Sequence, residues 1–278
     1  MQKMQKESGG VACNSRVVTE HKTGHGLCIA GLGLSLLLLT GTGVLAASDE
    51  LVVGNFSALP PKGIMLKMPK DWQPLTFKKI KTHSRYRHVL VDGRGAIEAR
   101  SENGASGLIR KLTINPAQYP VISWQWKVKN ILSKGDVSKK SGDDYPARIY
   151  ITFAYDSKKA GFWEGVKFDT YKMVYGEYPP VAAINYIWAN KAGIGRIFTN
   201  PYADRVKMIV IESGTAKVGK WLQERRNIVA DYRAAFKKEP PLISGIAIMT
   251  DTDNTGQSAT AWYGDIVMSR GVSSSRTP

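Results

Sequence analysis

The stretch Val121-Ile-Ser-Trp-Gln-Trp-Lys-Val128 decides the fold class of this chain. Its apolar side chains, Ile122, Trp124 and Trp126 among them, fall on alternate residues. Alternate residues of a β-strand point to the same face. The stretch therefore predicts a strand that buries two tryptophans in a hydrophobic core and turns its other face toward solvent.

Similar stretches recur on both sides, separated by clusters of Gly, Pro, Asn and Asp. In Arg148-Ile-Tyr-Ile-Thr-Phe153, for example, the apolar residues again share one face. No helices alternate with these strands, which favours an antiparallel β-sandwich over a parallel α/β sheet. The predicted strands are 85–91, 96–100, 107–113, 121–128, 148–155, 184–189, 205–212, 243–250 and 259–268.

Segment 217–238 breaks the β pattern. Apolar residues such as Val218, Leu222, Val229 and Tyr232 recur there with helical spacing, and Pro240-Pro241 follows. We expect one amphipathic helix over 217–238, lying on a sheet. Segments 133–142 and 160–180 are predicted loops.

The N-terminus has the pattern of an export signal. Residues 27–47 carry no charge, a basic stretch precedes them, and Val44-Leu-Ala46 is a cleavage site of the small-x-small type. We predict a signal peptide at 1–46, a linker at 47–54, a sandwich domain at 55–270 and a disordered Ser-rich tail at 271–278. The alternative is an uncleaved anchor, since 21 residues just suffice to span a bilayer.

The 278 residues include 39 Lys and Arg against 23 Asp and Glu, a formal charge of +16. The predicted leader holds four of the basic and two of the acidic residues, so the mature part keeps +14. An exported basic domain is expected to meet acidic glycans, lipid headgroups or acidic proteins rather than nucleic acid. The alternative is that the surplus serves solubility alone.

Several kinds of chemistry are excluded by what the sequence lacks. Both cysteines, Cys13 and Cys28, lie in the predicted leader, so a disulfide scaffold, a thiolate metal site and a cysteine nucleophile are excluded. The motifs G-x-S-x-G, H-E-x-x-H and G-x-x-x-x-G-K-[ST] are absent. Only His83 and His88 follow the leader, too few for a multi-histidine metal site.

A row of basic residues is the first candidate binding site. In an extended strand, alternate residues would project from one face about 6.6 Å apart, which suits a polymer with regularly spaced carboxylates or phosphates. The alternative is a solvated face or a charged sheet edge. The residues of the row are Lys79, Lys81, His83, Arg85 and Arg87.

Two aromatic residues in the predicted loop 160–180 complete the candidate ligand site. Trp163 and Tyr175 lie in a segment bounded by Gly and Pro, where rings can stack on sugar faces. The alternative is that they close the end of the sandwich.

Asp251 and Asp253 are the candidate metal ligands. They begin the phrase Asp-Thr-Asp-Asn-Thr-Gly, which resembles the first half of a calcium loop. Trp262 stands where an EF-hand needs its glutamate, so the expectation is at most one structural calcium ion and no other cofactor. The alternative is an Asx-type turn between two strands.

Two kinds of enzyme remain as alternatives. A polysaccharide lyase needs a base and a cation, which His83, Tyr86 and Arg85 offer by type. A glycoside hydrolase needs two carboxylates, and the spacing selects no pair. The carboxylates considered are Asp143, Asp144, Glu212, Asp251 and Asp265.

Several phrases, taken together and in order, resemble the bacterial family called domain of unknown function 3047. The resemblance covers about 55–270 and implies an exported protein with a galactose-binding-like jelly roll, as in carbohydrate-binding modules. It places Asn55-Phe56 and Tyr263-Gly-Asp-Ile266 at the first and last strands, and it assigns no catalytic residues. The phrases are Gly142-Asp-Asp-Tyr-Pro-Ala-Arg-Ile-Tyr150, Asn185-Tyr-Ile-Trp-Ala-Asn190, Asn200-Pro-Tyr-Ala-Asp-Arg-Val206, Met249-Thr-Asp-Thr-Asp-Asn-Thr-Gly256 and Trp262-Tyr-Gly-Asp-Ile266.

These observations predict an antiparallel jelly-roll β-sandwich with one inserted helix, exported to the periplasm or secreted after cleavage near Ala46. The expected function is non-catalytic binding of an acidic or neutral glycan of the envelope or the extracellular space. The alternatives are an enzyme acting on polysaccharide and a structural envelope protein that binds another protein. Contact with the membrane is expected only through an uncleaved leader.

Overall fold

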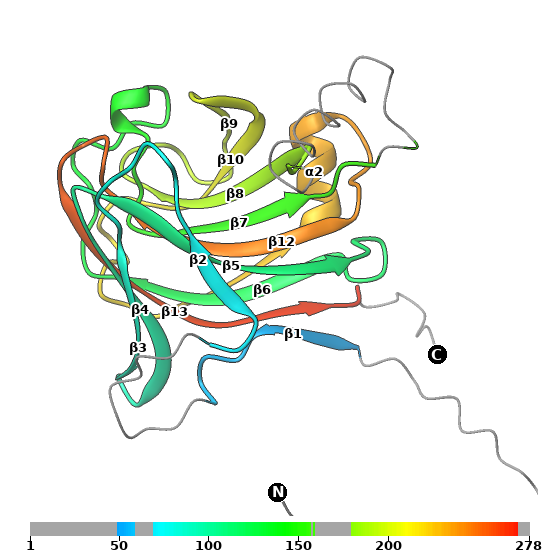
Figure 1. Cartoon of the computed structure of the whole chain (residues 1–278), viewed down its shortest axis with the longest axis horizontal. Helices are drawn as coiled ribbons and strands as arrows, with labels where there is room; N and C mark the ends of the chain where they lie inside the picture. The colour runs from blue at the N-terminus through cyan, green and yellow to red at the C-terminus, as the bar shows by residue number, and fades with distance from the viewer. Residues whose placement is uncertain (1–48, 59–68, 157, 159–178, 272–278) are drawn as a thin grey trace, which may run out of the picture. The chain divides into compact units, whose positions relative to one another are not determined.

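The computed structural model describes residues 49–58, 69–156, 158 and 179–271. The predicted leader and most of the predicted tail lie outside these residues. Within them the chain is mainly β, and its strands form two sheets (Figure 1). None of the helices in the described part is both long and apolar enough to cross a membrane.

The first sheet has six strands, in the order β11-β6-β13-β4-β3, with β1 also paired to β13. β13 is the longest strand, and it pairs with β6 along one edge and with β4 and then β1 along the other. The bounds are β1 Glu50–Gly54, β3 Arg85–Val91, β4 Arg94–Glu102, β6 Val121–Val128, β11 Leu222–Asn227 and β13 Ser258–Ser269.

The second sheet has seven strands, in the order β2-β5-β12-β7-β8-β10-β9. All its pairs are antiparallel except β8 with β10, which are parallel because β9 lies between them in the chain. The sandwich is therefore mixed rather than wholly antiparallel. The bounds are β2 Trp72–Leu75, β5 Ala105–Ile114, β7 Arg148–Phe153, β8 Ala182–Ala189, β9 Ile197–Asn200, β10 Ala203–Ser213 and β12 Ile243–Asp251.

The core between the sheets is built on aromatic contacts. Trp124 of β6 stacks on Tyr186 of β8, with ring centroids 5.2 Å apart and planes 18° apart. Trp126 meets Trp188 at 5.9 Å. All four side chains are fully buried, so the alternation in β6 identified core residues correctly. Burial of such large rings is a major source of the sandwich's stability.

The predicted helix is only half correct. The helix α2 spans Ile228–Phe236, and the preceding β11 is a strand that pairs with β6. Gly219 has a φ of 79°, a left-handed conformation that suits glycine and interrupts any helix there. The side chain of Asn227 then accepts a hydrogen bond from the amide of Ala230 and so caps α2.

Two further boundaries differ from the sequence prediction. Residues 50–54, expected to lie in a linker, form β1, and β1 pairs with β13. The first strand therefore ends just before Asn55-Phe56. The predicted loop 133–142 ends in a short 3-10 helix, Lys140–Gly142. The predicted loop 160–180 lies almost wholly outside the described residues.

Candidate functional site

The seven-stranded sheet turns one face to the core and the other away from it. Ile149 and Ile151 of β7 belong to the core, so Arg148, Tyr150 and Thr152 project from the opposite face. We call this second face the outer face of the seven-stranded sheet. It carries a polar cluster at one end and a groove beside it.

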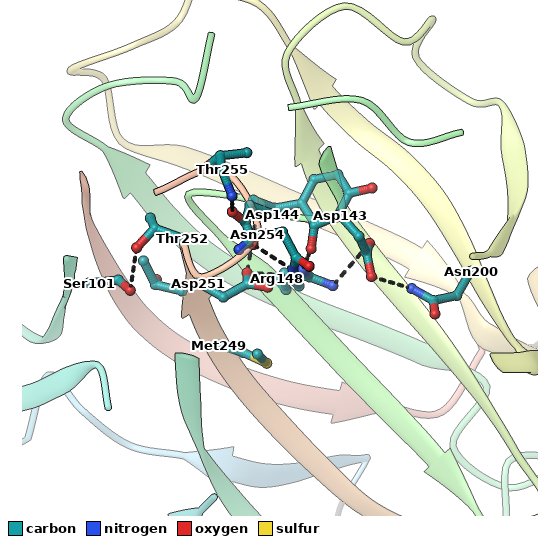
Figure 2. Close-up of polar contacts among 12 residues, drawn as sticks. Ser101, Asp143, Asp144, Arg148, Asn200, Met249, Asp251, Thr252, Asn254 and Thr255 are labelled. Atoms are coloured by element: carbon teal, nitrogen blue, oxygen red, sulfur yellow. Dashed lines mark hydrogen bonds and ion pairs between the residues drawn. The ribbon is translucent and has the colours of Figure 1, made fainter. Parts of the chain in front are cut away.

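Arg148 is the centre of the cluster, and its side chain is only 2% exposed. Its Nε donates to Asp251 Oδ1 at 2.8 Å, and its Nη2 donates to Asp251 Oδ2. Nη2 also donates to the carbonyl of Asp143, and Nη1 donates to the hydroxyl of Tyr150 at 3.0 Å. Figure 2 shows the side chain of Arg148 between Asp251 and Asp143. A buried guanidinium needs such a set of acceptors to offset its loss of hydration.

Asp144 fixes the loop between β12 and β13. Its Oδ2 accepts from the amide of Thr255 at 2.6 Å, and its Oδ1 accepts from the side chain of Asn254 at 3.1 Å (Figure 2). The loop also turns back on itself, because the amide of Gly256 donates to the carbonyl of Thr252. The phrase Asp-Thr-Asp-Asn-Thr-Gly thus forms a turn held by a carboxylate from another part of the chain.

The cluster carries more negative than positive charge. Asp143, Asp144, Asp251 and Asp253 gather there against the single guanidinium of Arg148. Burial raises the pKa of Asp251, and Arg148 acts against that rise. Burial and the nearby Asp144 also raise the pKa of Asp253. These raised values reflect the cost of placing several carboxylates together in a poorly hydrated place.

The geometry suits a cation only in part. Asp144, Asp251 and Asp253 each offer an oxygen, and these oxygens lie within 4.8 Å of one another. Both oxygens of Asp251, however, already accept hydrogen bonds from Arg148. A calcium ion at Asp251 and Asp253 stays a prediction.

A groove of about 610 Å³ lies on the same outer face. This volume is within the usual range for sites that bind small organic ligands. Phe77, which is 37% exposed, supplies an aromatic surface, and Tyr150 links the groove to the Arg148 cluster. Other lining residues are Gln73, Leu75, Ile109, Lys111, Thr152 and Ser244.

Tyr150 is placed to act as a hydrogen-bond donor in this groove. Its oxygen accepts from Nη1 of Arg148, which leaves its own hydrogen available to a ligand. Burial raises the pKa of Tyr150 to about 12 against the opposing effect of Arg148, so the hydroxyl keeps its proton at neutral pH. The groove therefore combines apolar and aromatic groups with neutral polar groups and the charged side chain of Lys111.

An unsatisfied amide lies beside Tyr150. Asn185 of β8 faces Tyr150 across the β7–β8 pair and is fully buried. Neither its Oδ1 nor its Nδ2 has a hydrogen-bond partner among the residues that the structure describes. Such a group costs about 1–3 kcal/mol, so its presence in a sheet otherwise built of paired polar groups marks this part of the face as unusual.

The prediction that the five basic residues share one strand face is wrong. β3 begins at Arg85, and the amide of Ile80 donates to the carbonyl of Phe77 in a turn, so Lys79, Lys81 and His83 precede the strand. A strand face therefore presents only the two arginines of the row. Arg85 lies 3.7 Å from Glu102, and Nε of Arg87 lies 2.6 Å from Glu98.

The other candidate residues are also separated. Trp163 and Tyr175 lie outside the described residues. The hydroxyl of Tyr86 donates to the carbonyl of Ser106 and accepts from the amide of Thr250, so it points into the fold. Burial raises the pKa of Tyr86 well above its usual value, which makes it a poor base. The set of His83, Tyr86 and Arg85 considered for a lyase is not assembled.

The five carboxylates considered for a glycoside hydrolase lie in different parts of the fold. Asp143, Asp144 and Asp251 meet around Arg148 and the loop after β12, as described above. Glu212 pairs with Lys217 at 2.5 Å instead. Asp265 belongs to the other sheet and accepts from the amide of Ser57 at 2.8 Å. Each of these carboxylates is therefore held by the fold, and two of them, Asp143 and Asp251, pair with Arg148 of the protein itself.

Sequence reasoning missed Arg148, Tyr150 and Asn185. The alternation of 148–153 contained the signal for the first two, because its second face is entirely polar or aromatic. Asn185 lies in a strand whose eight residues are all buried, and it gives no such signal.

The fold, the Arg148 cluster and the groove together define a jelly-roll domain with a ligand-sized groove on one sheet. The chain belongs to the family described as protein of unknown function (DUF3047), whose model matches residues 70–267. The resemblance noted in the sequence is thereby confirmed. No curated protein matches the chain.

Solved structures with a similar fold include two of carbohydrate-binding modules. A family 11 carbohydrate-binding module of a cellulosomal cellulase from Clostridium thermocellum aligns at 10% identity and a TM-score of 0.41, covering 83% of this chain and all of that one. A family 11 module from the same organism, in complex with a β-1,3-1,4-mixed-linked tetrasaccharide, aligns at 11% identity and a TM-score of 0.37, covering 81% and 98%. These likenesses concern the fold alone.

Proposed function

We propose that this chain is an exported, non-catalytic glycan-binding domain and that the groove on the outer face of the seven-stranded sheet is its binding surface. The observation that carries the proposal is the lining of the groove. Phe77 offers an aromatic face, while Gln73, Thr152 and the hydroxyl of Tyr150 offer polar groups. Sugars present both apolar C–H faces and hydroxyl groups, so a surface of this mixed kind complements them.

The setting of the groove supports binding rather than chemistry. Its nearest charged cluster is occupied internally, since Arg148 and the loop after β12 hold Asp251 and Asp144. Tyr150 keeps its proton and is suited to donate a hydrogen bond. We therefore propose recognition of an acidic or neutral glycan of the envelope or the extracellular space, reached through the leader at 1–46.

Replacing Phe77 by alanine is expected to weaken glycan binding by about 2- to 12-fold, the range that an aromatic contact contributes. The measurement is titration calorimetry against neutral glucans and galactans and against uronate polymers, with product analysis after incubation. Leu90→Ala is the matched control, because Leu90 is exposed on β3 of the other sheet. Equal losses in both variants would remove the groove from the proposal. New reducing ends would favour a hydrolase, and unsaturated uronate would favour a lyase.

Calcium is expected to raise Tm by about 5–10 °C at a hundredfold excess over its Kd, and chelator should reverse the rise. The reason is the surplus of carboxylates around Arg148, which a divalent cation would offset. Asp253→Asn should abolish the shift while leaving the pair of Arg148 and Asp251 in place. No shift in the wild type, or an unchanged shift in the variant, would leave the loop as a turn without a metal.

A further inference from the structure

The outer face of the six-stranded sheet carries a second pocket, of about 540 Å³, between β4, β13 and β6. Trp262 of β13 lies opposite Lys127 of β6. Thr260 lies opposite Arg100 of β4, and the backbone carbonyl of Thr260 accepts a hydrogen bond from the amide of Lys129. Trp262 is half-buried while its neighbours in β13 are in the core, so its ring belongs to the outer face.

The ring of Trp262 lies beside a fixed cation. Lys127 Nζ is 5.5 Å from the ring centroid and 2.7 Å from Asp92 Oδ2, and the lysine side chain is only 15% exposed. A cation beside the electron-rich face of an indole is attracted to it. The arrangement holds an aromatic surface and a positive charge next to each other.

The cations around the pocket exceed the carboxylates that neutralise them. Arg100 shares Glu98 with Arg87, so two guanidiniums are matched by one carboxylate. Lys129 is exposed and forms no ion pair with any carboxylate in the described part of the chain. Glu102 is the one carboxylate among the described lining residues. Positive charge therefore remains for a ligand.

We propose that this pocket binds a uronate unit of an acidic polysaccharide. The sugar ring would lie against Trp262, and its carboxylate would meet Lys129 and Arg100. The hydroxyl of Thr260 and the carboxylate of Glu102 suit the sugar's hydroxyl groups. This surface and the groove belong to different sheets, so the two sites are independent.

The test is titration calorimetry of the whole protein with alginate oligomers and with neutral cello-oligosaccharides of the same length. We expect the alginate oligomers to bind more tightly than the neutral oligosaccharides. We also expect the affinity for alginate to fall as salt is added. Trp262→Ala should lower the alginate affinity by about 2- to 12-fold. Lys129→Glu, a change on the surface that leaves the core untouched, should lower the affinity and its dependence on salt. Lys191→Glu makes the same charge change at another exposed lysine and should leave binding as in the wild type.

Three outcomes would overturn the proposal. Equal affinity for alginate and neutral oligomers would remove the preference for acidic sugars. Alginate binding that Phe77→Ala abolishes and Trp262→Ala spares would place the acidic glycan in the groove, with the proposed function intact. Competition by duplex DNA at equal affinity would make this face a general polyanion surface.

Discussion

Replacing Arg148 by methionine is expected to lower Tm by about 6–20 °C, corresponding to about 3–5 kcal/mol of stability. The variant removes the partner of Asp251 and leaves that carboxylate 2% exposed and uncompensated. Asp143 also loses the ion pair at its Oδ1, and its backbone carbonyl loses a donor. Circular dichroism melting of the protein measures the effect.

A matched control separates this result from the loss of any surface arginine. Arg233 pairs with Glu239 at 2.8 Å, but both side chains are more than half exposed. Arg233→Met should lower Tm far less than Arg148→Met does, because water screens such an exposed pair. A Tm for Arg148→Met equal to that of the control would show that the cluster does not need its guanidinium.

The double variant Arg148→Met/Asp251→Leu tests the cause. Removing the stranded carboxylate together with its partner should recover part of the lost stability, since the buried charge is the main cost. Recovery will be partial, because Asp143 and Asp144 remain in the cluster. A double variant no more stable than Arg148→Met would assign the loss to packing of the arginine side chain.

Trp124→Ala has the second large expected effect, a loss of about 3–5 kcal/mol and a Tm lower by about 6–20 °C. Trp124 is fully buried and contacts Tyr186 in the opposite sheet and Trp126 in its own strand. Alanine would leave a cavity between the sheets where the two faces meet. Denaturant unfolding gives the change in free energy.

Trp124→Phe is the informative comparison. The indole Nε1 of Trp124 is buried and has no hydrogen-bond partner within residues 49–58, 69–156, 158 and 179–271. Phenylalanine keeps most of the ring contacts and removes that unsatisfied donor, so its cost should be clearly smaller than that of alanine. A phenylalanine variant as unstable as the alanine variant would contradict the description of this core.

The sequence predicted strands well where one face is buried and the other exposed. β3 and β6 have the predicted bounds, because their alternation reflects real burial. Segment 217–227 was wrongly predicted to be helical, because its apolar residues fit a helical period. Part of it is β11, an edge strand, and no local pattern reveals its pairing with β6. β1 was missed for a similar reason, since only its last two residues are buried.

The candidate site was less predictable than the fold. The loop at 251–256 was identified from its spacing, but its partners Arg148 and Asp144 are about a hundred residues away in the chain. The groove arises where β2, β5, β7 and β12 lie side by side, which depends on sheet order. The five basic residues do not share one strand face, because β3 begins at Arg85 and a turn at Ile80 precedes it.

The central claim is that the groove on the seven-stranded sheet binds a glycan without changing it. The measurement is glycan binding by the wild-type protein and by Phe77→Ala, with the products analysed in the same samples. We expect saturable binding to at least one glycan, weakened by about 2- to 12-fold in the variant, and no product. Binding that the variant leaves unchanged, or conversion of the bound glycan by the wild type, would contradict it.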